Sequence, residues 1–154
     1  MTPSVLLSIR FSRRSVGVAV FIGLQLEYTQ SRQFSSGVDR AEASLTGLLN
    51  WLLASFNVES AAIEGATEST RPRQARLLRA AVAVIRNASI PIWDISEQDL
   101  LTGFGQPPLK NRHQLRMLMC RIWPALNARG TAHWILDAVA IGLHTQLECL
   151  FLHH

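Results

Sequence analysis

The chain has 154 residues, of which 48% are hydrophobic and 17% charged, and its formal net charge at pH 7 is +4. These values exclude a disordered chain and predict one core in a single domain over residues 1–154, and the isolated cysteines argue against a zinc module. The positive balance is typical of proteins with a polyanionic partner such as nucleic acid, although a coding bias toward arginine would give the same total.

Two apolar runs, Val5–Phe11 and Ser15–Leu24, begin the chain and are separated by a short polar break that contains Arg13 and Arg14. Their β-branched content and the short break predict a hairpin. A pair of arginines before an apolar run is also typical of an export signal. The run that follows, Val16–Leu26, is too short to span a bilayer, so we interpret it as a strand and expect a cytoplasmic protein.

Alternating polar and apolar residues predict a third strand over Gln25–Phe34. Apolar residues then recur at helical spacing over Val38–Phe56, and Asp39 lies in the first turn, where the helix dipole favours an acid. The short apolar segment Ser60–Glu64 predicts a buried strand that ends on an acidic residue. The next periodic segment, Arg73–Arg86, predicts a helix with one arginine face and one apolar face.

A brief strand is predicted over Ile90–Asp94, and its proline favours the edge of the sheet. Ser96, followed three residues later by an aspartate, predicts the N-cap of a short helix. The amphipathic segment Lys110–Trp123 and the almost wholly apolar segment His133–Leu150 predict two more helices, the second of them buried. This order of strands and helices predicts an α/β fold with a mixed sheet.

Four segments, taken together and in this order, resemble the bacterial Holliday-junction resolvases of the RuvC type, in the ribonuclease H-like superfamily. Ser8–Val20 is similar to the family's first hairpin, Ala62–Glu64 to its fourth strand, and Asp137–Leu143 to its C-terminal helix. Leu100–Gly105, followed by the lone lysine of the chain, Lys110, is similar to the family's glycine turn and lysine. The resemblance implies a mixed five-stranded sheet, with the first three strands antiparallel, flanked by helices.

The resemblance also implies phosphodiester hydrolysis, in which carboxylates hold two Mg²⁺ or Mn²⁺ ions. The chain retains Glu64 and Asp137, which would be the metal ligands of an active enzyme. The position of the family's first-strand aspartate is Arg10, and no shift of the alignment supplies an aspartate, because the only acid before residue 39 is Glu27. His133 lies four residues before Asp137 and is either a substitute for a missing ligand or a solvent-facing residue.

Two buried carboxylates without a cation would repel each other, and a planar guanidinium can bind carboxylates through two parallel hydrogen bonds. We therefore expect Arg10 to take the place of the metal and to pair with Glu64, Asp137 or both. The alternative is that Arg10 points outward. An altered or vestigial catalytic site would also include Lys110 and His133.

Three functions remain open. The first is a catalytically impaired relative that binds nucleic acid through Arg13, Arg14, Arg73, Arg76, Lys110 and Arg112. The second is an active Mg²⁺- or Mn²⁺-dependent endonuclease that resolves Holliday junctions, in which Glu68 could supply another carboxylate. The third is a scaffold that binds no nucleic acid.

The missing aspartate favours the first function. For it we expect no metal cofactor, branched or duplex DNA as the partner, a homodimer, and no membrane association. Thr67 lies where the family has an aromatic residue that opens the junction, which argues against junction specificity. The terminal histidines, His153 and His154, are interpreted as a tail rather than a metal site.

Overall fold

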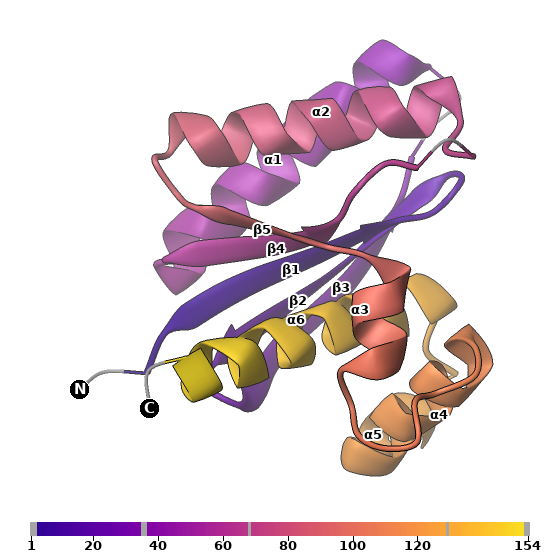
Figure 1. Ribbon diagram of the computed structural model, residues 1–154. Coiled ribbons are helices and arrows are strands. Elements are labelled where there is room, and N and C mark those ends of the chain that lie inside the picture. Colours follow the sequence, from indigo (N-terminus) through magenta and orange to yellow (C-terminus); the bar gives the residue numbers. More distant parts are fainter. Residues whose placement is uncertain (1–2, 35–36, 68, 129, 153–154) are drawn as a thin grey trace.

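Five strands form one mixed sheet in the computed structural model, which describes residues 3–34, 37–67, 69–128 and 130–152 (Figure 1). The strands are β1 (Val5–Phe11), β2 (Ser15–Ile22), β3 (Gln25–Gln33), β4 (Ser60–Glu64) and β5 (Ile92–Ile95). Their order is β3-β2-β1-β4-β5, with β1, β2 and β3 antiparallel and with β4 parallel to both β1 and β5. The predicted mixed sheet is confirmed. Glu68, His153 and His154 lie outside the described residues.

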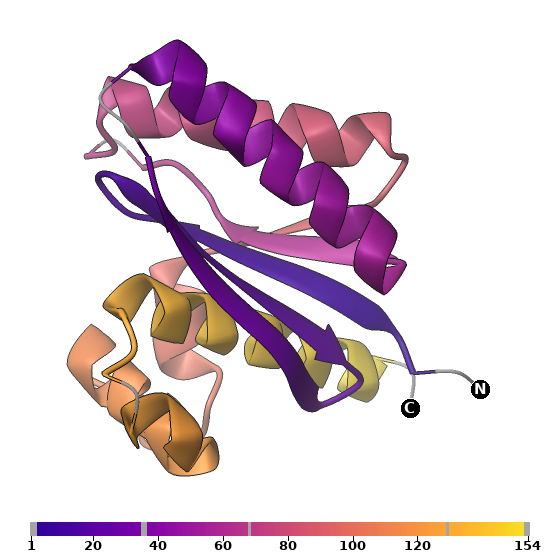
Figure 2. The ribbon, with the colours of Figure 1, turned by 180° about the vertical axis from the view of Figure 1, so that it is seen from behind.

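Helices cover both faces of the sheet (Figures 1 and 2). One face carries α1 (Val38–Phe56) and α2 (Pro72–Asn87), and the other carries α3 (Glu97–Thr102), α4 (Arg112–Ile122), α5 (Pro124–Ala128) and α6 (His133–Leu152). The helix predicted from Lys110 begins two residues later, because the Asn111 side chain caps it by accepting a hydrogen bond from the Gln114 N–H at 3.0 Å. The chain therefore forms three layers with α6 against the centre of the sheet.

The alternation of side chains along β1 decides which face each residue meets. Leu7, Ile9 and Phe11 are buried in the core beneath α1 and α2. Leu6 is buried in the second core, beneath α6. Because residues two or four apart share a face of a strand, Arg10 lies on the α6 face with Leu6.

The first turns of α6 rest directly on the sheet. Gly17 of β2 allows this approach, because a Cβ atom there would lie 2.5 Å from the carbonyl oxygen of Trp134. The Ser8 hydroxyl of β1 donates a 2.6 Å hydrogen bond to the Ala138 carbonyl of α6. The close packing brings the start of α6 to the end of β1.

The apolar character of α6 is accounted for by this packing. The window His133–Phe151 is long and apolar enough to cross a membrane, with a mean hydropathy of 1.2, but 61% of it is buried inside the protein. Core helices of this kind are hydrophobic on all sides because both the sheet and neighbouring helices cover them.

Candidate functional site

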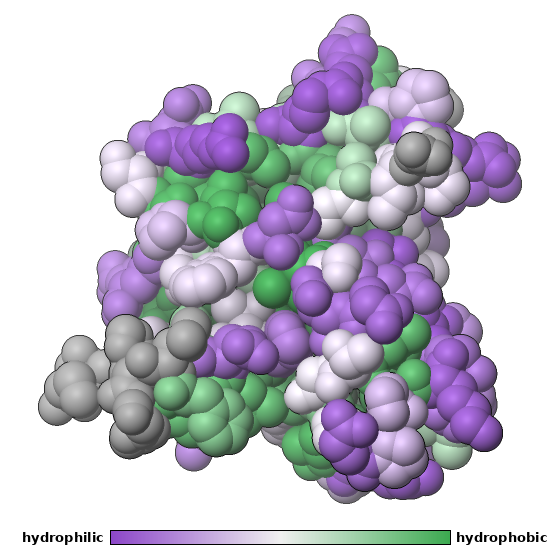
Figure 3. Space-filling view, in the orientation of Figure 1, coloured by the Kyte–Doolittle hydropathy of each residue, from purple (hydrophilic) through white to green (hydrophobic). Residues whose placement is uncertain are grey.

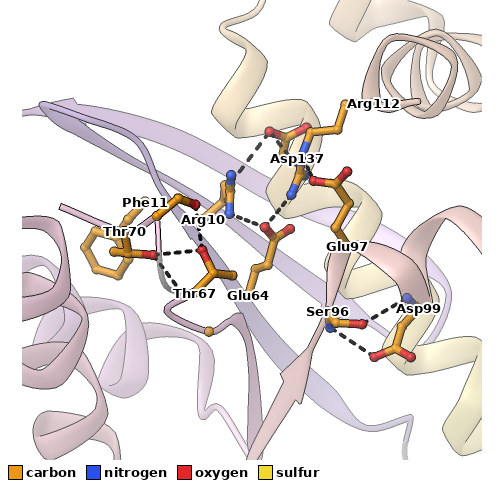
Figure 4. Close-up of polar contacts among 12 residues, drawn as sticks. Arg10, Phe11, Glu64, Thr67, Thr70, Ser96, Glu97, Asp99, Arg112 and Asp137 are labelled. Carbon is orange, nitrogen blue, oxygen red and sulfur yellow. Dashed lines mark hydrogen bonds and ion pairs between the residues drawn. The ribbon is translucent and has the colours of Figure 1, made fainter.

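The retained acids meet at the end of the sheet where β1 and β4 run parallel. Ile9 of β1 is paired with Ile63 of β4, so the next residues, Arg10 and Glu64, are neighbours across the two strands. Asp137 lies one turn into α6 and faces the same point. Figure 4 shows the Arg10 guanidinium between the two carboxylates.

Arg10 pairs with both acids. Its Nη1 donates to Glu64 Oε2, and its Nε lies 3.8 Å from Asp137 Oδ2. The Glu64 and Asp137 side chains are only 7% and 3% exposed, so this is a largely buried ion pair. The pairing expected from the sequence is confirmed, and the alternative of an outward-pointing Arg10 is wrong.

Two further arginines, both from α4, complete the site. Arg112 donates from Nη2 to Glu64 Oε2 and from Nε to Glu97 Oε2 at 3.0 Å, and its Nη1 lies 3.7 Å from Asp137 Oδ2. Arg116 holds Asp137 with two parallel hydrogen bonds, Nε to Oδ1 at 2.9 Å and Nη2 to Oδ2 at 3.0 Å. Such bidentate pairs are the strongest arginine–carboxylate contacts.

Sequence reasoning missed Arg116 and expected Arg112 to contact nucleic acid. The structure places Arg112 among the carboxylates, with a side chain that is 15% exposed. The spacing of four residues puts both arginines on one face of α4 and was the only signal that could have found them. The three arginines and three acids that meet here form the inner cluster: Arg10, Glu64, Glu97, Arg112, Arg116 and Asp137.

The charges of the inner cluster balance, since three guanidiniums face three carboxylates. Burial lowers the pKa of Arg10, and the neighbouring Glu64 opposes this shift. Burial also acts on Arg112, but the hydrogen bond and charge of Glu64 and the charges of Asp137 and Glu97 outweigh it and raise the pKa. Both guanidiniums remain charged, because arginine does not lose its proton in proteins.

Two polar atoms of the inner cluster are buried without a hydrogen-bond partner among the described residues. They are Glu64 Oε1 and Arg112 Nη1. A buried polar atom left in this state costs about 1–3 kcal/mol, so each of the two calls for a physical explanation.

Solved structures share the arrangement of helices and strands, whereas no protein-family model and no curated protein matches the sequence. RuvC from Thermus thermophilus in complex with a Holliday junction substrate superposes with a TM-score of 0.73 at 15% identity, covering 92% of this chain and 91% of that one. A second structure of Thermus thermophilus RuvC covers 96% of both chains with the same score and identity. The chain has the RuvC fold.

The yeast mitochondrial Holliday junction resolvase Ydc2 extends the likeness, with a TM-score of 0.67 at 12% identity over 96% of this chain and 81% of that one. The resemblance inferred from four short motifs is therefore confirmed for the fold and over nearly the full length. At these identities the likeness establishes the fold, and the role of the inner cluster has to be argued from its own chemistry.

The residues present do not fit the pair of divalent ions that the resemblance to RuvC implies. Among the described residues, no group of three or more His, Cys, Asp or Glu side chains could hold a metal ion. Glu64 and Asp137 are already hydrogen-bonded to guanidiniums, and an added Mg²⁺ would face three fixed cations.

Lys110 and His133 do not join the inner cluster as an altered RuvC site would require. Lys110 is exposed, its backbone N–H donates to Gln114 Oε1 at 2.8 Å, and it makes no ion pair with any described acid. His133 is exposed, with Nδ1 3.4 Å from Arg116 Nη1. His133 therefore lies beside the cluster, and Lys110 lies apart from it.

A second group of arginines lies at the same end of this RuvC fold. Arg13 and Arg14 of the β1–β2 turn, with Arg71 and Arg73 at the start of α2 and the neighbouring Gln74, line a cavity of about 220 Å³. No described acid lies within ion-pair distance of the first three of these arginines, which are exposed. The four arginines are called the outer cluster below.

Arg76, which was expected to contact nucleic acid, differs from the outer cluster. Its guanidinium donates to Glu42 Oε1 at 2.6 Å and to Asp39 Oδ1 at 2.9 Å, both on α1. These bonds raise the pKa of Arg76, with the Glu42 hydrogen bond as the largest cause. The arginine face predicted for this helix is therefore partly neutralised by α1.

The two clusters are connected along the surface. A cavity of about 540 Å³ is lined by Arg10, Glu64, Glu97 and Arg112 of the inner cluster and by hydroxyl side chains of the β4–α2 loop. Gln74 lines this cavity and the smaller one, and its Nε2 donates to the Phe11 carbonyl at 3.3 Å. Hydrophilic residues gather along this end of the molecule, from α3 to the start of α2 (Figure 3).

Proposed function

We propose that this chain is a RuvC-fold protein that binds nucleic acid and does not hydrolyse it. The observation that carries the proposal is the inner cluster, in which guanidiniums hydrogen-bond to Glu64 Oε2 and to both oxygens of Asp137. Hydrolysis by two metal ions requires those carboxylates to be free for the cations that orient the attacking water. A cluster already neutralised by arginine offers no such position.

The outer cluster supports the binding half of the proposal. Arg13, Arg14 and Arg71 have no described acid within ion-pair distance and are well suited to phosphate groups, because their planar donors match two phosphate oxygens. Thr67, in place of an aromatic side chain, bonds to Ser69 and Thr70 hydroxyls and offers no ring to stack on a base. These features favour recognition of the sugar–phosphate backbone over recognition of bases.

Branched DNA is the first ligand to test and duplex DNA the second, since Thermus thermophilus RuvC is described with a Holliday junction substrate. The proposal includes a single domain over residues 1–154, a cytoplasmic location and a homodimer. A dimer would let two copies of each cluster contact two arms of one branched substrate. Light scattering on the purified chain tests the dimer directly.

The test of binding is fluorescence anisotropy with a labelled four-way junction and a labelled duplex at several salt concentrations. We expect affinity to fall steeply with salt, because arginine contacts to phosphate release bound counterions. Absence of binding at low salt would overturn this proposal and favour the third function, a scaffold that binds no nucleic acid.

The test of catalysis is incubation of the same junction with Mg²⁺ or Mn²⁺. We expect no cleavage and no rise of the melting temperature on adding either ion, because a bound ligand would stabilise the folded state. Cleavage that disappears in Glu64→Gln would establish the active endonuclease instead. The variant is needed as a control because a contaminating nuclease would cleave equally in both preparations.

A further inference from the structure

Glu97 differs from the other two acids of the inner cluster. Its side chain is 53% exposed, whereas those of Glu64 and Asp137 are 7% and 3% exposed. It comes from the first turn of the short helix α3 and makes one hydrogen bond to the cluster, from Arg112 Nε at 3.0 Å. Exposed ion pairs contribute little stability because water screens them, so Glu97 can leave at small cost.

Without Glu97, the cluster has three guanidiniums and two carboxylates and carries one positive charge in excess. Glu97 supplies the third anion at the rim of the 540 Å³ cavity, where solvent has access. Arg112 Nη1 is also buried without a hydrogen-bond acceptor among the described residues. Without Glu97, the cluster therefore has the charge and the donors to hold another anion. The Glu97 carboxylate occupies part of that position.

A phosphate group is the anion that matches this position. A phosphodiester carries a single negative charge, equal to that of the Glu97 carboxylate. Its oxygens accept hydrogen bonds from a guanidinium in the geometry that a carboxylate uses. The cavity at the inner cluster adjoins the outer cluster at Gln74, so a backbone bound at one can continue toward the other.

We propose that Glu97 is an internal competitor for phosphate, and that nucleic acid displaces it from Arg112 when a phosphodiester enters the inner cluster. The inference rests on the proposed nucleic-acid binding and adds a second phosphate position to it. The affinity for nucleic acid depends in part on how easily a phosphate displaces Glu97 from Arg112. Glu97 thus limits binding without contacting the ligand.

The test compares Glu97→Gln with Glu59→Gln, which removes the same charge from an exposed residue at the opposite end of β4. Binding of a labelled duplex is measured by anisotropy at one fixed salt concentration, after both variants are shown to melt like the parent. We expect Glu97→Gln to bind at least about fivefold more tightly, the lower end of typical couplings between sites. Glu59→Gln is expected to match the parent.

A second probe separates this inference from the proposed function. Inorganic pyrophosphate is added to the parent and to both variants, and the melting temperature is followed. We expect the largest rise in Glu97→Gln, because a ligand stabilises the form that binds it most tightly.

Each pattern of results decides one question. If Glu97→Gln and Glu59→Gln bind duplex DNA with equal affinity, whether or not both bind more tightly than the parent, the role of Glu97 is overturned. The proposed function then stays in place. Stabilisation of Glu97→Gln by pyrophosphate, with no binding of any DNA, supports the phosphate position and overturns the proposed function. No response to either probe overturns both.

Discussion

The inner and outer clusters lie at the same end of the sheet and are both rich in arginine, yet their surroundings make them different kinds of site. In the inner cluster every guanidinium has an acidic partner, and the two main carboxylates are almost fully buried. In the outer cluster Arg13, Arg14 and Arg71 are exposed and have no described acid within ion-pair distance. The role of an arginine therefore depends on the acids that the fold brings to it, which the charge total does not reveal.

The largest expected effect is on stability, from removing Arg116. Arg116→Ala leaves the buried Asp137 without its bidentate partner, and breaking a buried pair costs roughly 3–5 kcal/mol. We expect about 3 kcal/mol, the lower end of that range, because Arg10 Nε and Arg112 Nη1 remain 3.8 and 3.7 Å from Asp137. The free energy of unfolding is measured in urea, with Arg13→Ala as the matched control from the outer cluster. Equal stability of the two variants would remove the distinction between the clusters.

Arg10→Ala is expected to lower the stability of the protein by less than Arg116→Ala does. Glu64 keeps its bond to Arg112 and Asp137 keeps Arg116, so the change removes one charged hydrogen bond rather than a whole pair. We expect a loss of about 2 kcal/mol, as is typical for hydrogen bonds to charged groups. Urea unfolding measures it, and a variant as stable as the parent would show that Arg10 is not a structural partner of the carboxylates.

The outer cluster is tested by binding rather than by stability. The double variant Arg13→Ala/Arg14→Ala should bind duplex DNA more weakly and lower the slope of log affinity against log salt by roughly 2, since each phosphate contact contributes about 0.9. Its unfolding should match the parent within about 0.5 kcal/mol, as for most surface changes. Arg86→Ala/Arg121→Ala removes the same charge from exposed residues outside both cavities. A similar loss of slope in that control would mean that DNA contacts the whole basic surface.

The smallest expected effect is on stability, from removing the charge of Asp99 in the cap of α3. It distinguishes the contribution of the cap from the electrostatic role of Glu97 in the same helix. Asp99 accepts a hydrogen bond from the Ser96 N–H at 2.9 Å, and the backbone and side-chain bonds with Ser96 lower the pKa of Asp99. A carboxyl with a lowered pKa stabilises the fold above its unfolded pKa and loses this contribution as the pH falls through the folded value. We expect Asp99→Asn to cost about 1 kcal/mol at pH 7, as for other caps, with the difference from the parent shrinking below about pH 4. A constant difference down to pH 2 would contradict the assignment.

The sequence predicted most of the fold because its signals are local. The alternation of Gln25–Phe34 and the helical spacing of Val38–Phe56 depend only on neighbouring residues, and the bounds of α1 and β4 agree with the prediction. The resemblance brought Arg10, Glu64 and Asp137 together as candidates but left open whether Arg10 points outward, and the structure decides for the pairing.

The rest of the site depends on contacts between distant segments. Arg112 and Arg116 carry no mark that distinguishes them from surface arginines of an amphipathic helix, and only the packing of α4 beside α6 brings them to Asp137. The ion pairs of Arg76 could not be read from the sequence for the same reason, because its partner Asp39 lies 37 positions away in the chain. Charge patterns in the sequence identify candidates, and tertiary contacts decide which of them are neutralised.

The three arginines of the inner cluster come from two separate elements, β1 and α4, and this origin has a consequence for its evolution. Exchanging Arg10 for aspartate would replace a cation of the inner cluster with an anion, so that Arg112 and Arg116 alone would face four carboxylates, and losing Arg116 would remove the bidentate partner of the buried Asp137. Single substitutions in the inner cluster therefore carry a cost in stability. The guanidiniums and carboxylates of the inner cluster therefore have to change together, which limits the order in which successive mutations can alter the site.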